Sequence, residues 1–233
     1  IEALLKRQPE LLYIPVDISA TALEQSSRVL LQSYPKLSIN AYASDYYEAI
    51  NALRGEQRGR VLALFLGSNI GNFDVEEAHT FLRALRGVLN IGDALLLGVD
   101  LRKKAQILEE AYDDALGVTA AFNLNLLTRI NREFEADFNL RAFRHEVVYN
   151  EESGRVEVYI VSKQKQTVSI RRLEMEIHFA EGERIHTENS YKYDPAGLSQ
   201  LASATGYTRA RTWLDEREQF SSNLFIAVEK SKE

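Results

Sequence analysis

The chain has 233 residues, of which 45% are hydrophobic and 27% are charged, and its formal net charge is -6. Proteins that track nucleic-acid phosphates usually carry a basic patch, so this acidic balance argues against a nucleic-acid partner. The chain contains no cysteine and no run of about 18 apolar residues, which excludes disulfides and thiolate metal ligands and argues against a membrane span. We expect a cytoplasmic, monomeric protein with one large domain or two small ones.

The first part of the chain alternates predicted strands and helices. Apolar runs predict strands at 11–18, 37–43, 61–66 and 93–99. Helical patterns precede, separate or follow them at 1–7, 20–34, 46–54 and 75–90, and Pro35 ends the second of these. This alternation predicts a parallel sheet with right-handed crossovers.

The third predicted strand leads into a glycine-rich turn. Residues 61–66 are all apolar, which is typical of a strand buried on both faces of a parallel sheet. Gly67 and Gly71 allow the backbone after it to turn sharply and to approach a ligand closely. Ligands of open α/β sheets bind at the carboxyl ends of the strands, so we expect Asn69 and Asn72 to project their amides into a site. An ordinary strand–helix turn would fit the same pattern.

Acidic residues follow three of the predicted strands, at Asp17, Asp45 and Asp100. In doubly wound sheets, an acid after the second strand typically binds ribose hydroxyls. An acid after the next strand can accept from an adenine amino group, and Tyr46 offers a ring for stacking. The arrangement suits an adenosyl ligand that lacks phosphates. Each Asp could instead be a turn or N-cap residue, which is the commoner role of an isolated Asp after a strand.

The pattern changes after about residue 103. Helices are predicted at 105–112 and 119–134, followed by short strands at 147–149, 156–161, 168–170 and 175–179. Alternating apolar residues in these strands predict an antiparallel sheet with one packed face and one wetter face. A helix at 195–206 and strands at 209–214 and 223–228 follow. We therefore expect a cofactor-binding core at 1–115, a substrate-binding lobe at 116–192 and a return to the core sheet at 193–233.

The four histidines are the candidate metal ligands: His79, His145, His178 and His186. They lack the i, i+4 spacing of a helical metal site. His178 and His186 lie in the strand-rich part and could form a pair, but solvated or hydrogen-bonded histidines are commoner. We predict no metal.

Five segments together resemble a known family: YIPVDIS at 13–19, FLGSNIGNF at 65–73, LGVDLRK at 97–103, AYDDALGVTAAFNLNLL at 111–127 and FAEGERIHTENSYKY at 179–193. They are similar to the histidine-specific, S-adenosylmethionine-dependent N-methyltransferases of the ergothioneine pathway. The resemblance implies an α/β fold, in which a Rossmann-like class I methyltransferase sheet carries an inserted antiparallel β-rich substrate-binding lobe. It further implies methylation of the α-amino nitrogen of histidine, up to the trimethyl betaine hercynine.

The resemblance also implies a binding site for the cofactor S-adenosyl-L-methionine. By position, Asp17 matches the family's ribose-binding acid, and Asp45 and Tyr46 match the pair at the adenine edge. Gly67 and Ser68, in the glycine-rich turn, are also expected to contact the cofactor. These five residues are the predicted cofactor site.

The substrate site is carried over in the same way. Asn72 matches the asparagine that holds the amino-acid head and orients the amine, and Tyr112 matches a tyrosine that grips the same group. Glu188, Asn189 and Ser190 match the segment that reads the side chain, with Glu188 and Ser190 on the imidazole. A carboxylate accepts from one ring N–H and a hydroxyl serves the other nitrogen, so this pair can satisfy both edges of the ring.

One departure from the family pattern concerns the N-terminal part. Class I methyltransferases carry a glycine-rich cofactor loop after their first strand, and this sequence starts beyond that position. We therefore expect this part to be missing, and the 233-residue chain alone to bind the cofactor weakly and to turn over slowly. Two alternatives stay open: a methyltransferase that acts on another amino acid or a histidine derivative, and a truncated, non-catalytic remnant.

Overall fold

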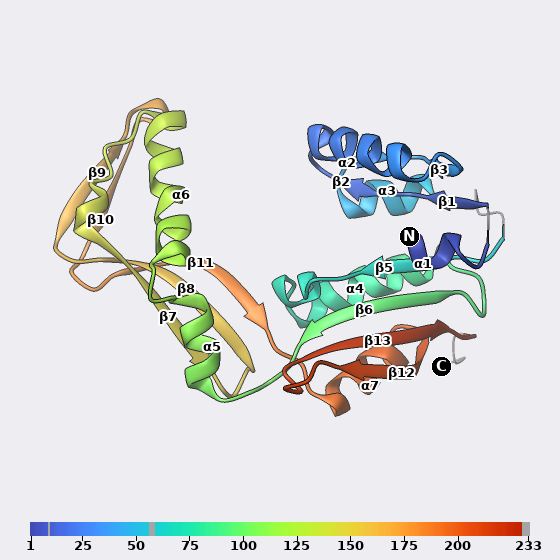
Figure 1. Cartoon of the computed structure of the whole chain (residues 1–233). Helices are drawn as coiled ribbons and strands as arrows, with labels where there is room; N and C mark the ends of the chain where they lie inside the picture. The colour runs from blue at the N-terminus through green and yellow to red at the C-terminus, as the bar shows by residue number, and fades with distance from the viewer. Residues whose placement is uncertain (9, 56–58, 230–233) are drawn as a thin grey trace.

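The computed structural model describes residues 1–8, 10–55 and 59–229, and it forms a core and a lobe that are joined after the end of strand β6 (Figure 1). The core contains a four-stranded sheet in the order β12-β13-β6-β5. Strand β5 runs parallel to β6, whereas β13 runs antiparallel to both of its neighbours. The strands are β5 (Leu62–Phe65), β6 (Ala94–Asp100), β12 (Tyr207–Leu214) and β13 (Phe220–Ala227).

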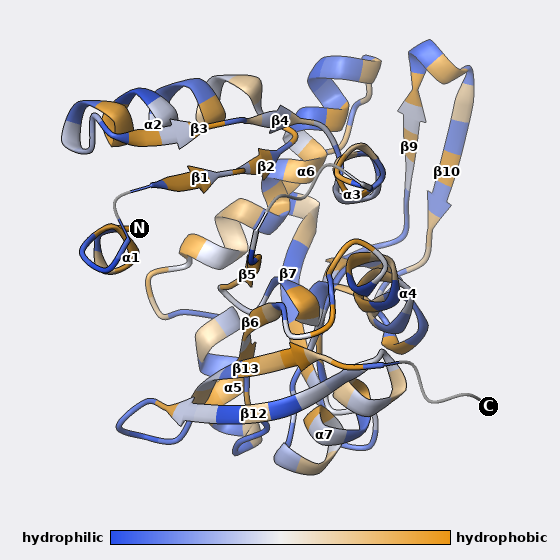
Figure 2. Cartoon of the chain, turned by 90° about the vertical axis from the view of Figure 1, so that its right-hand side faces the viewer, coloured by the Kyte–Doolittle hydropathy of each residue, from blue (hydrophilic) through white to orange (hydrophobic). Residues whose placement is uncertain are grey.

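Two helices cover one face of this sheet: α4 (Val75–Arg86) and α7 (Pro195–Ala204). Leu82 of α4 and Leu198 of α7 pack with Leu97 of β6 and Phe225 of β13, and all four side chains are buried. Figure 2 shows the apolar colour of β13 beside the more polar β12, whose residues are largely exposed at the edge of the sheet. The predicted class I methyltransferase arrangement, with its closing helix and antiparallel hairpin, is confirmed.

The prediction that 61–66 is buried on both faces is wrong. Within the described residues, β5 pairs only with β6 and lies at the edge of the four-stranded sheet. Leu62 and Leu64 are consequently 40% and 46% exposed, whereas Phe65 on the other face is buried. The apolar run is a sign of burial only when strands or helices cover both faces of the strand.

The N-terminal strands form two separate parallel pairs. β1 (Leu11–Tyr13) pairs with β3 (Leu37–Ile39), and β2 (Val16–Asp17) pairs with β4 (Tyr42–Ala43). The single strand predicted at 11–18 is interrupted because Pro15 has no amide hydrogen for the ladder. The helices of this part are α1 (Glu2–Leu5), α2 (Ala20–Ser33) and α3 (Tyr46–Ala52).

The lobe contains the three-stranded antiparallel sheet β11-β8-β7 and the hairpin β9–β10. Val156 and Val158 of β8 pack against Leu108 of α5, while Ile160 packs against Leu127 of α6. α5, which the predicted division assigned to the core, therefore packs on the lobe. The elements are α5 (Ala105–Tyr112), α6 (Val118–Phe134), β7 (Phe143–Asn150), β8 (Arg155–Ser162), β9 (Gln166–Ile170), β10 (Met175–Phe179) and β11 (Arg184–Tyr191), with 3-10 turns at Leu140–Ala142 and Arg171–Leu173.

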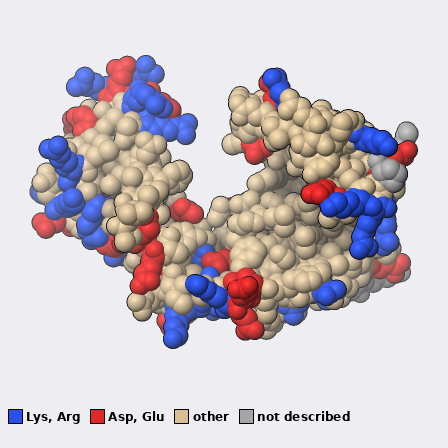
Figure 3. Space-filling view, in the orientation of Figure 1, with Lys and Arg blue, Asp and Glu red and all other residues tan. Residues whose placement is uncertain are grey.

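A deep hollow separates the upper lobe from the N-terminal strands and helices (Figure 3). At the bottom of this hollow, β11 returns from the lobe and contacts the turn that follows β5. The carboxyl ends of β5 and β6 face this contact (Figure 1). None of the helices in the described ranges is long and apolar enough to span a membrane.

Candidate active site

A cavity of about 390 Å³ lies where the core sheet meets the lobe. Its walls come from the turn after β5, the end of β6, the end of α5, the strand β11 and the start of β13. Six of the predicted site residues line it: Gly67, Ser68, Asn72, Tyr112, Glu188 and Ser190. The structure thus brings together residues that are up to 153 positions apart in the sequence, from Gly67 to Phe220. Asn69, whose amide was expected to project into a site, lines it as well, and the structure adds three residues that were not predicted there: Asp100, Lys192 and Phe220.

The turn after β5 is shaped by two residues with positive φ. Gly67 has a φ of +75° and Ser68 a φ of +63°, after which the 3-10 turn η1 (Asn69–Asn72) places Asn72 at the cavity wall. The Oγ of Ser68 accepts a hydrogen bond of 2.9 Å from the backbone N–H of Asp100, which ties the turn to β6. Helix α4 then begins at Val75, and its N-cap residue Asp74 forms the predicted capping box with Glu77.

Gly71 allows this turn to contact the lobe. A Cβ atom at Gly71 would lie 2.7 Å from the backbone oxygen of Tyr191 at the end of β11. The predicted close approach is therefore present, although the group approached is protein backbone. Tyr193 supports the same turn through a hydrogen bond of 3.5 Å to the carbonyl of Ile70, and burial raises the pKa of its hydroxyl above the usual range.

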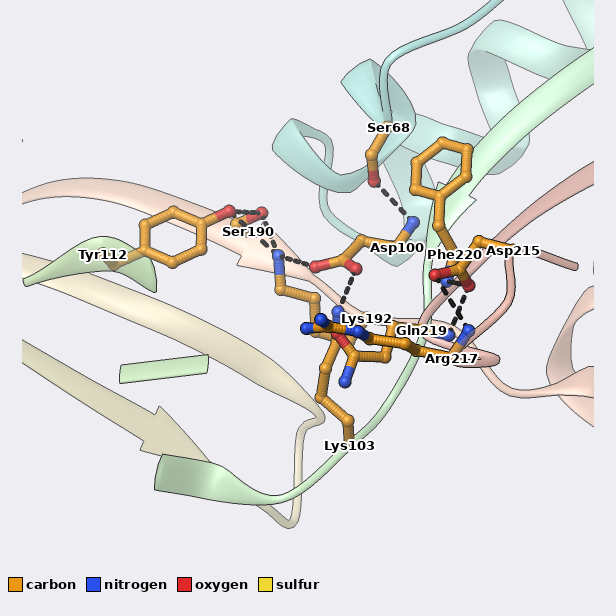
Figure 4. A network of polar contacts seen from close by, with 10 residues as sticks. All are labelled: Ser68, Asp100, Lys103, Tyr112, Ser190, Lys192, Asp215, Arg217, Gln219 and Phe220. Atoms are coloured by element: carbon orange, nitrogen blue, oxygen red, sulfur yellow. Dashed lines mark hydrogen bonds and ion pairs between the residues drawn. The ribbon is translucent and has the colours of Figure 1, made fainter. Parts of the chain in front are cut away.

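Tyr112 and Ser190 meet directly in the cavity wall. The hydroxyl of Tyr112 donates to Ser190 Oγ at 2.7 Å, and the Nζ of Lys192 lies 2.9 Å and 2.8 Å from these two oxygens (Figure 4). Lys192 also pairs with Asp100 at 3.0 Å, and Asp100 pairs with Lys103 at 2.5 Å. This polar network connects the end of β6 to the lobe.

A second pair of side chains holds the backbone of Tyr112. The side-chain nitrogen of Asn123 donates to His145 Nδ1 at 2.9 Å and to the carbonyl of Tyr159 at 3.1 Å. Because an amide nitrogen only donates, Nδ1 accepts and His145 is left with its hydrogen on Nε2. That nitrogen lies 2.9 Å from the backbone oxygen of Tyr112 and donates to it. His145 therefore has a structural role next to the cavity.

The three predicted substrate-binding residues of strand β11 lie on two different faces of the strand. Glu188 and Ser190 are two residues apart in an extended strand and both line the cavity, as their spacing predicts. Asn189 lies between them and turns to the other face, where its Oδ1 is 2.9 Å from Nε2 of His186. Asn189 is outside the set of cavity-lining residues, and its role in substrate binding stays a prediction.

The three residues expected at the ribose and adenine lie in the N-terminal part and outside the cavity-lining set. Asp17 ends β2, and its Oδ1 accepts from the backbone N–H of Ser19 at 2.7 Å. Asp45 is the N-cap of α3 and accepts from two backbone N–H groups through one oxygen. The ring of Tyr46 is 38% exposed and lies edge-on to Phe65, with the centroids 5.5 Å apart. Their binding roles stay predictions.

Two further residues of the network could have been found from the sequence. Asp100 was recognised as an acid at a strand end but received no role. Lys192 continues the i, i+2 series of Glu188 and Ser190 by one more step, so its side chain is expected on the same side. In the ranges that the structure describes, no group of three or more His, Asp and Glu side chains is placed to hold a metal ion.

Comparisons with known proteins assign the chain to a protein family. The sequence model of a family described as "Histidine-specific methyltransferase, SAM-dependent" matches residues 1–227. The chain is 40% identical to "Histidine N-alpha-methyltransferase" of Mycobacterium tuberculosis over 91% of this chain and 65% of that protein. It is 30% identical to "Ergothioneine biosynthesis protein 1" of Schizosaccharomyces pombe over 72% of this chain and 22% of that protein. A third relative is an L-tryptophan methyltransferase of Psilocybe serbica, which is 30% identical over 73% of this chain and 48% of that protein.

Among solved structures, an S-adenosylmethionine-dependent methyltransferase from Clostridium acetobutylicum superposes with a TM-score of 0.47 at 10% identity, over 93% of this chain and 75% of that chain. The chain spans less than two thirds of the length of each of the three curated relatives above. The family match nevertheless extends over nearly the whole sequence. This chain therefore belongs to the family of histidine-specific, S-adenosylmethionine-dependent methyltransferases.

Proposed function

We propose that the protein methylates the α-amino nitrogen of histidine with S-adenosyl-L-methionine, up to the trimethyl betaine hercynine, as a step in ergothioneine biosynthesis. The observation that carries the proposal is a single cavity lined by Asn72 of the core and by Glu188 and Ser190 of the lobe. An amide for the amino-acid head and a carboxylate–hydroxyl pair for a ring therefore line one space. The names of the relatives from M. tuberculosis and S. pombe support the same substrate and pathway.

The residues in the cavity are compatible with the two halves of histidine. Glu188 accepts from one ring N–H and the Ser190 hydroxyl serves the second nitrogen. Asn72 offers a neutral amide to the amine and the carboxylate, and Tyr112, whose hydrogen is donated to Ser190, offers a lone pair to the amine. Asn72 orients the amine without adding charge, which matters because the nucleophile must be the neutral amine: an ammonium has no lone pair. Correct orientation is the main requirement for the transfer.

The chain also offers groups for the cofactor, which supplies an activated methyl group when it is bound. Gly67 and Ser68 lie at the cavity wall with backbone conformations that leave room for close approach. Within the described residues, only Oδ1 of Asp17 and only Oδ1 of Asp45 are engaged, so each carboxylate keeps an oxygen for a hydroxyl or an amino group. These placements support Asp17 at the ribose, and Asp45 with Tyr46 at the adenine.

Two features of the strands support the expectation that an N-terminal part with the cofactor loop is missing. In the described part of the chain, β1 and β5 each have one strand partner, and Leu12, Leu62 and Leu64 are between 40% and 56% exposed. Each of these two strands therefore has one backbone edge at which a further strand would fit. Weak cofactor binding by the 233-residue chain alone stays a prediction. So do a cytoplasmic location, a monomeric state and the absence of nucleic-acid partners.

Replacing Glu188 with alanine is expected to lower kcat/KM for histidine by about 10- to 100-fold in the intact protein, because a hydrogen bond to a charged group is lost. Activity on tryptophan should not fall, since the indole is larger than imidazole and gains the space that the Glu188 side chain leaves. The measurement is steady-state methyl transfer with each amino acid. An equal loss for both substrates would contradict the assignment of Glu188 to the ring.

The same assay separates the alternatives. The tryptophan-methylating relative from P. serbica keeps a second substrate open. A wild-type protein that methylates tryptophan in preference to histidine would establish that alternative. A protein that transfers no methyl group to histidine, tryptophan or N-methylated histidines would be a non-catalytic remnant.

A further inference from the structure

A buried lysine ammonium lies behind the two hydroxyls of the substrate pocket. The side chain of Lys192 is 1% exposed, and its Nζ contacts Tyr112 Oη at 2.9 Å, Ser190 Oγ at 2.8 Å and Asp100 Oδ2 at 3.0 Å. The ammonium also lies 4.7 Å from the centroid of the Tyr112 ring. Figure 4 shows these contacts converging on Nζ.

The three contacts use every hydrogen that Lys192 can donate. An ammonium has three donors and no acceptor, and its three oxygen partners here are supplied by the protein. Lys192 could bind a substrate carboxylate only by giving up one of them. A buried charge also requires its counter-ion, and Asp100 supplies it while Lys103 pairs with the other oxygen of Asp100. Lys192 therefore acts on the substrate through Tyr112 and Ser190.

The direction of these hydrogen bonds determines what Ser190 can offer to a ligand. Ser190 Oγ accepts from Lys192 at 2.8 Å. It also lies 2.7 Å from the hydroxyl of Tyr112, and the phenol donates in this pair because it is a much stronger acid than the aliphatic hydroxyl of serine. A hydroxyl has two acceptor lone pairs and one hydrogen, so both acceptor positions are taken. Only the O–H of Ser190 remains for a group in the cavity that Ser190 lines.

We infer that Lys192 is a positioning residue that makes Ser190 a hydrogen-bond donor and thereby selects the neutral imidazole ring of the substrate. The inference rests on the proposed function. A neutral imidazole has one N–H, which Glu188 accepts, and one bare nitrogen, which accepts from Ser190. An imidazolium carries hydrogens on both nitrogens and would place one of them against the hydrogen of Ser190.

Several charged or titratable groups surround Ser190 and the proposed position of the imidazole ring. The cavity wall and the residues in contact with it contribute Asp100, Lys103, Tyr112, Glu188 and Lys192, with His145 behind the backbone of Tyr112. Their titration could alter binding of any ligand. A ligand of the same shape whose ring does not titrate therefore provides the internal control.

The test is the dissociation constant of histidine at about pH 8 and about pH 5.5, by calorimetry on the intact protein saturated with S-adenosylhomocysteine. Free imidazole has a pKa of about 6.5, so the neutral fraction falls about 10-fold over this range and the dissociation constant should rise about 10-fold. The control ligand is 1,2,4-triazol-3-ylalanine, whose ring stays neutral over the range. The dissociation constant of this control ligand should change less than about 2-fold between the two pH values, because its ring is neutral at both.

The variant Lys192→Met removes the donor, so Ser190 regains a lone pair and can accept from an imidazolium N–H. The change in the dissociation constant of histidine between the two pH values should fall below about 3-fold. The matched control Lys103→Met removes the other cation on Asp100 but leaves Tyr112 and Ser190 bonded to Lys192, and it should keep the change of about 10-fold.

Two results would overturn the inference. One is a wild-type protein in which histidine and the triazole show the same pH dependence, a comparison that needs no variant to fold. The other is a folded Lys192→Met protein, verified by its melting curve, that keeps the full pH dependence. The wild-type protein could also bind neither histidine nor the triazole at either pH and methylate neither of them. In that case the proposed function fails, and the inference fails with it.

Discussion

Replacing Asn72 with alanine is expected to lower kcat/KM for histidine by about 10²- to 10³-fold, with most of the loss in kcat. Asn72 ends the η1 turn at the cavity wall, and we propose that its neutral amide orients the substrate amine. Without it, the lone pair is no longer held in line with the methyl group. The measurement is steady-state kinetics on the intact protein at saturating cofactor.

Asn69 provides the matched control for this prediction. It lies at the other end of the same turn and its amide also lines the cavity, but the family resemblance assigns it no contact with the substrate amine. Asn69→Ala should lower kcat/KM less than about 5-fold, because removing this amide does not disturb the alignment of the reacting atoms. Equal losses for the two variants would show that the turn as a whole, and not the Asn72 amide, orients the amine.

Replacing Gly71 with alanine is expected to destabilise the protein by about 2–3 kcal/mol, because the added methyl group overlaps backbone that cannot move freely. The new Cβ would lie 2.7 Å from the carbonyl oxygen of Tyr191 and 3.6 Å from Ser190 Oγ. The turn and β11 must separate, which moves Asn72 away from Ser190. A displacement of about 1 Å can cost about 100-fold in rate, so kcat should fall by that order.

Urea unfolding and steady-state kinetics measure the two effects separately. The control is Gly197→Ala in α7, where the nearest atom to the new Cβ is Asp194 Oδ1 at an ordinary contact distance of 3.6 Å. This change should leave activity intact and stabilise the protein by up to about 1 kcal/mol, since alanine is the better helix former. A Gly71→Ala protein with wild-type stability would contradict the close packing of the turn on β11.

The elements nearest the site were the most predictable from the sequence. The turn at 67–73 carries its own signals, because glycine marks the positive φ at Gly67 and the capping pattern fixes the start of α4. Period-two alternation in a strand is enough to place Glu188 and Ser190 on one face. The same rule turns Asn189 to the opposite face, where it bonds His186.

Long-range pairing accounts for what the sequence did not reveal. The Lys192–Asp100 contact joins the ends of two strands that are distant in the chain, and no local pattern encodes it. The exposure of Leu62 and Leu64 depends on which strands flank β5, and the apolar run alone does not report this. Asp17 accepts a hydrogen bond from a backbone N–H in a turn, and Asp45 accepts one at a helix N-terminus. These local roles follow from the sequence, whereas a role in binding a ligand depends on contacts with the ligand itself.

The site of methylation is the most direct measure of whether the cavity presents the α-nitrogen of histidine to the cofactor. The intact protein would be supplied with histidine and with S-adenosylmethionine that carries ¹³C in its methyl group, and the product examined by NMR. The expected result is a labelled trimethylammonium signal that correlates with the α-carbon of histidine. Label on a ring nitrogen, or no label in histidine while another amino acid is methylated, would contradict it.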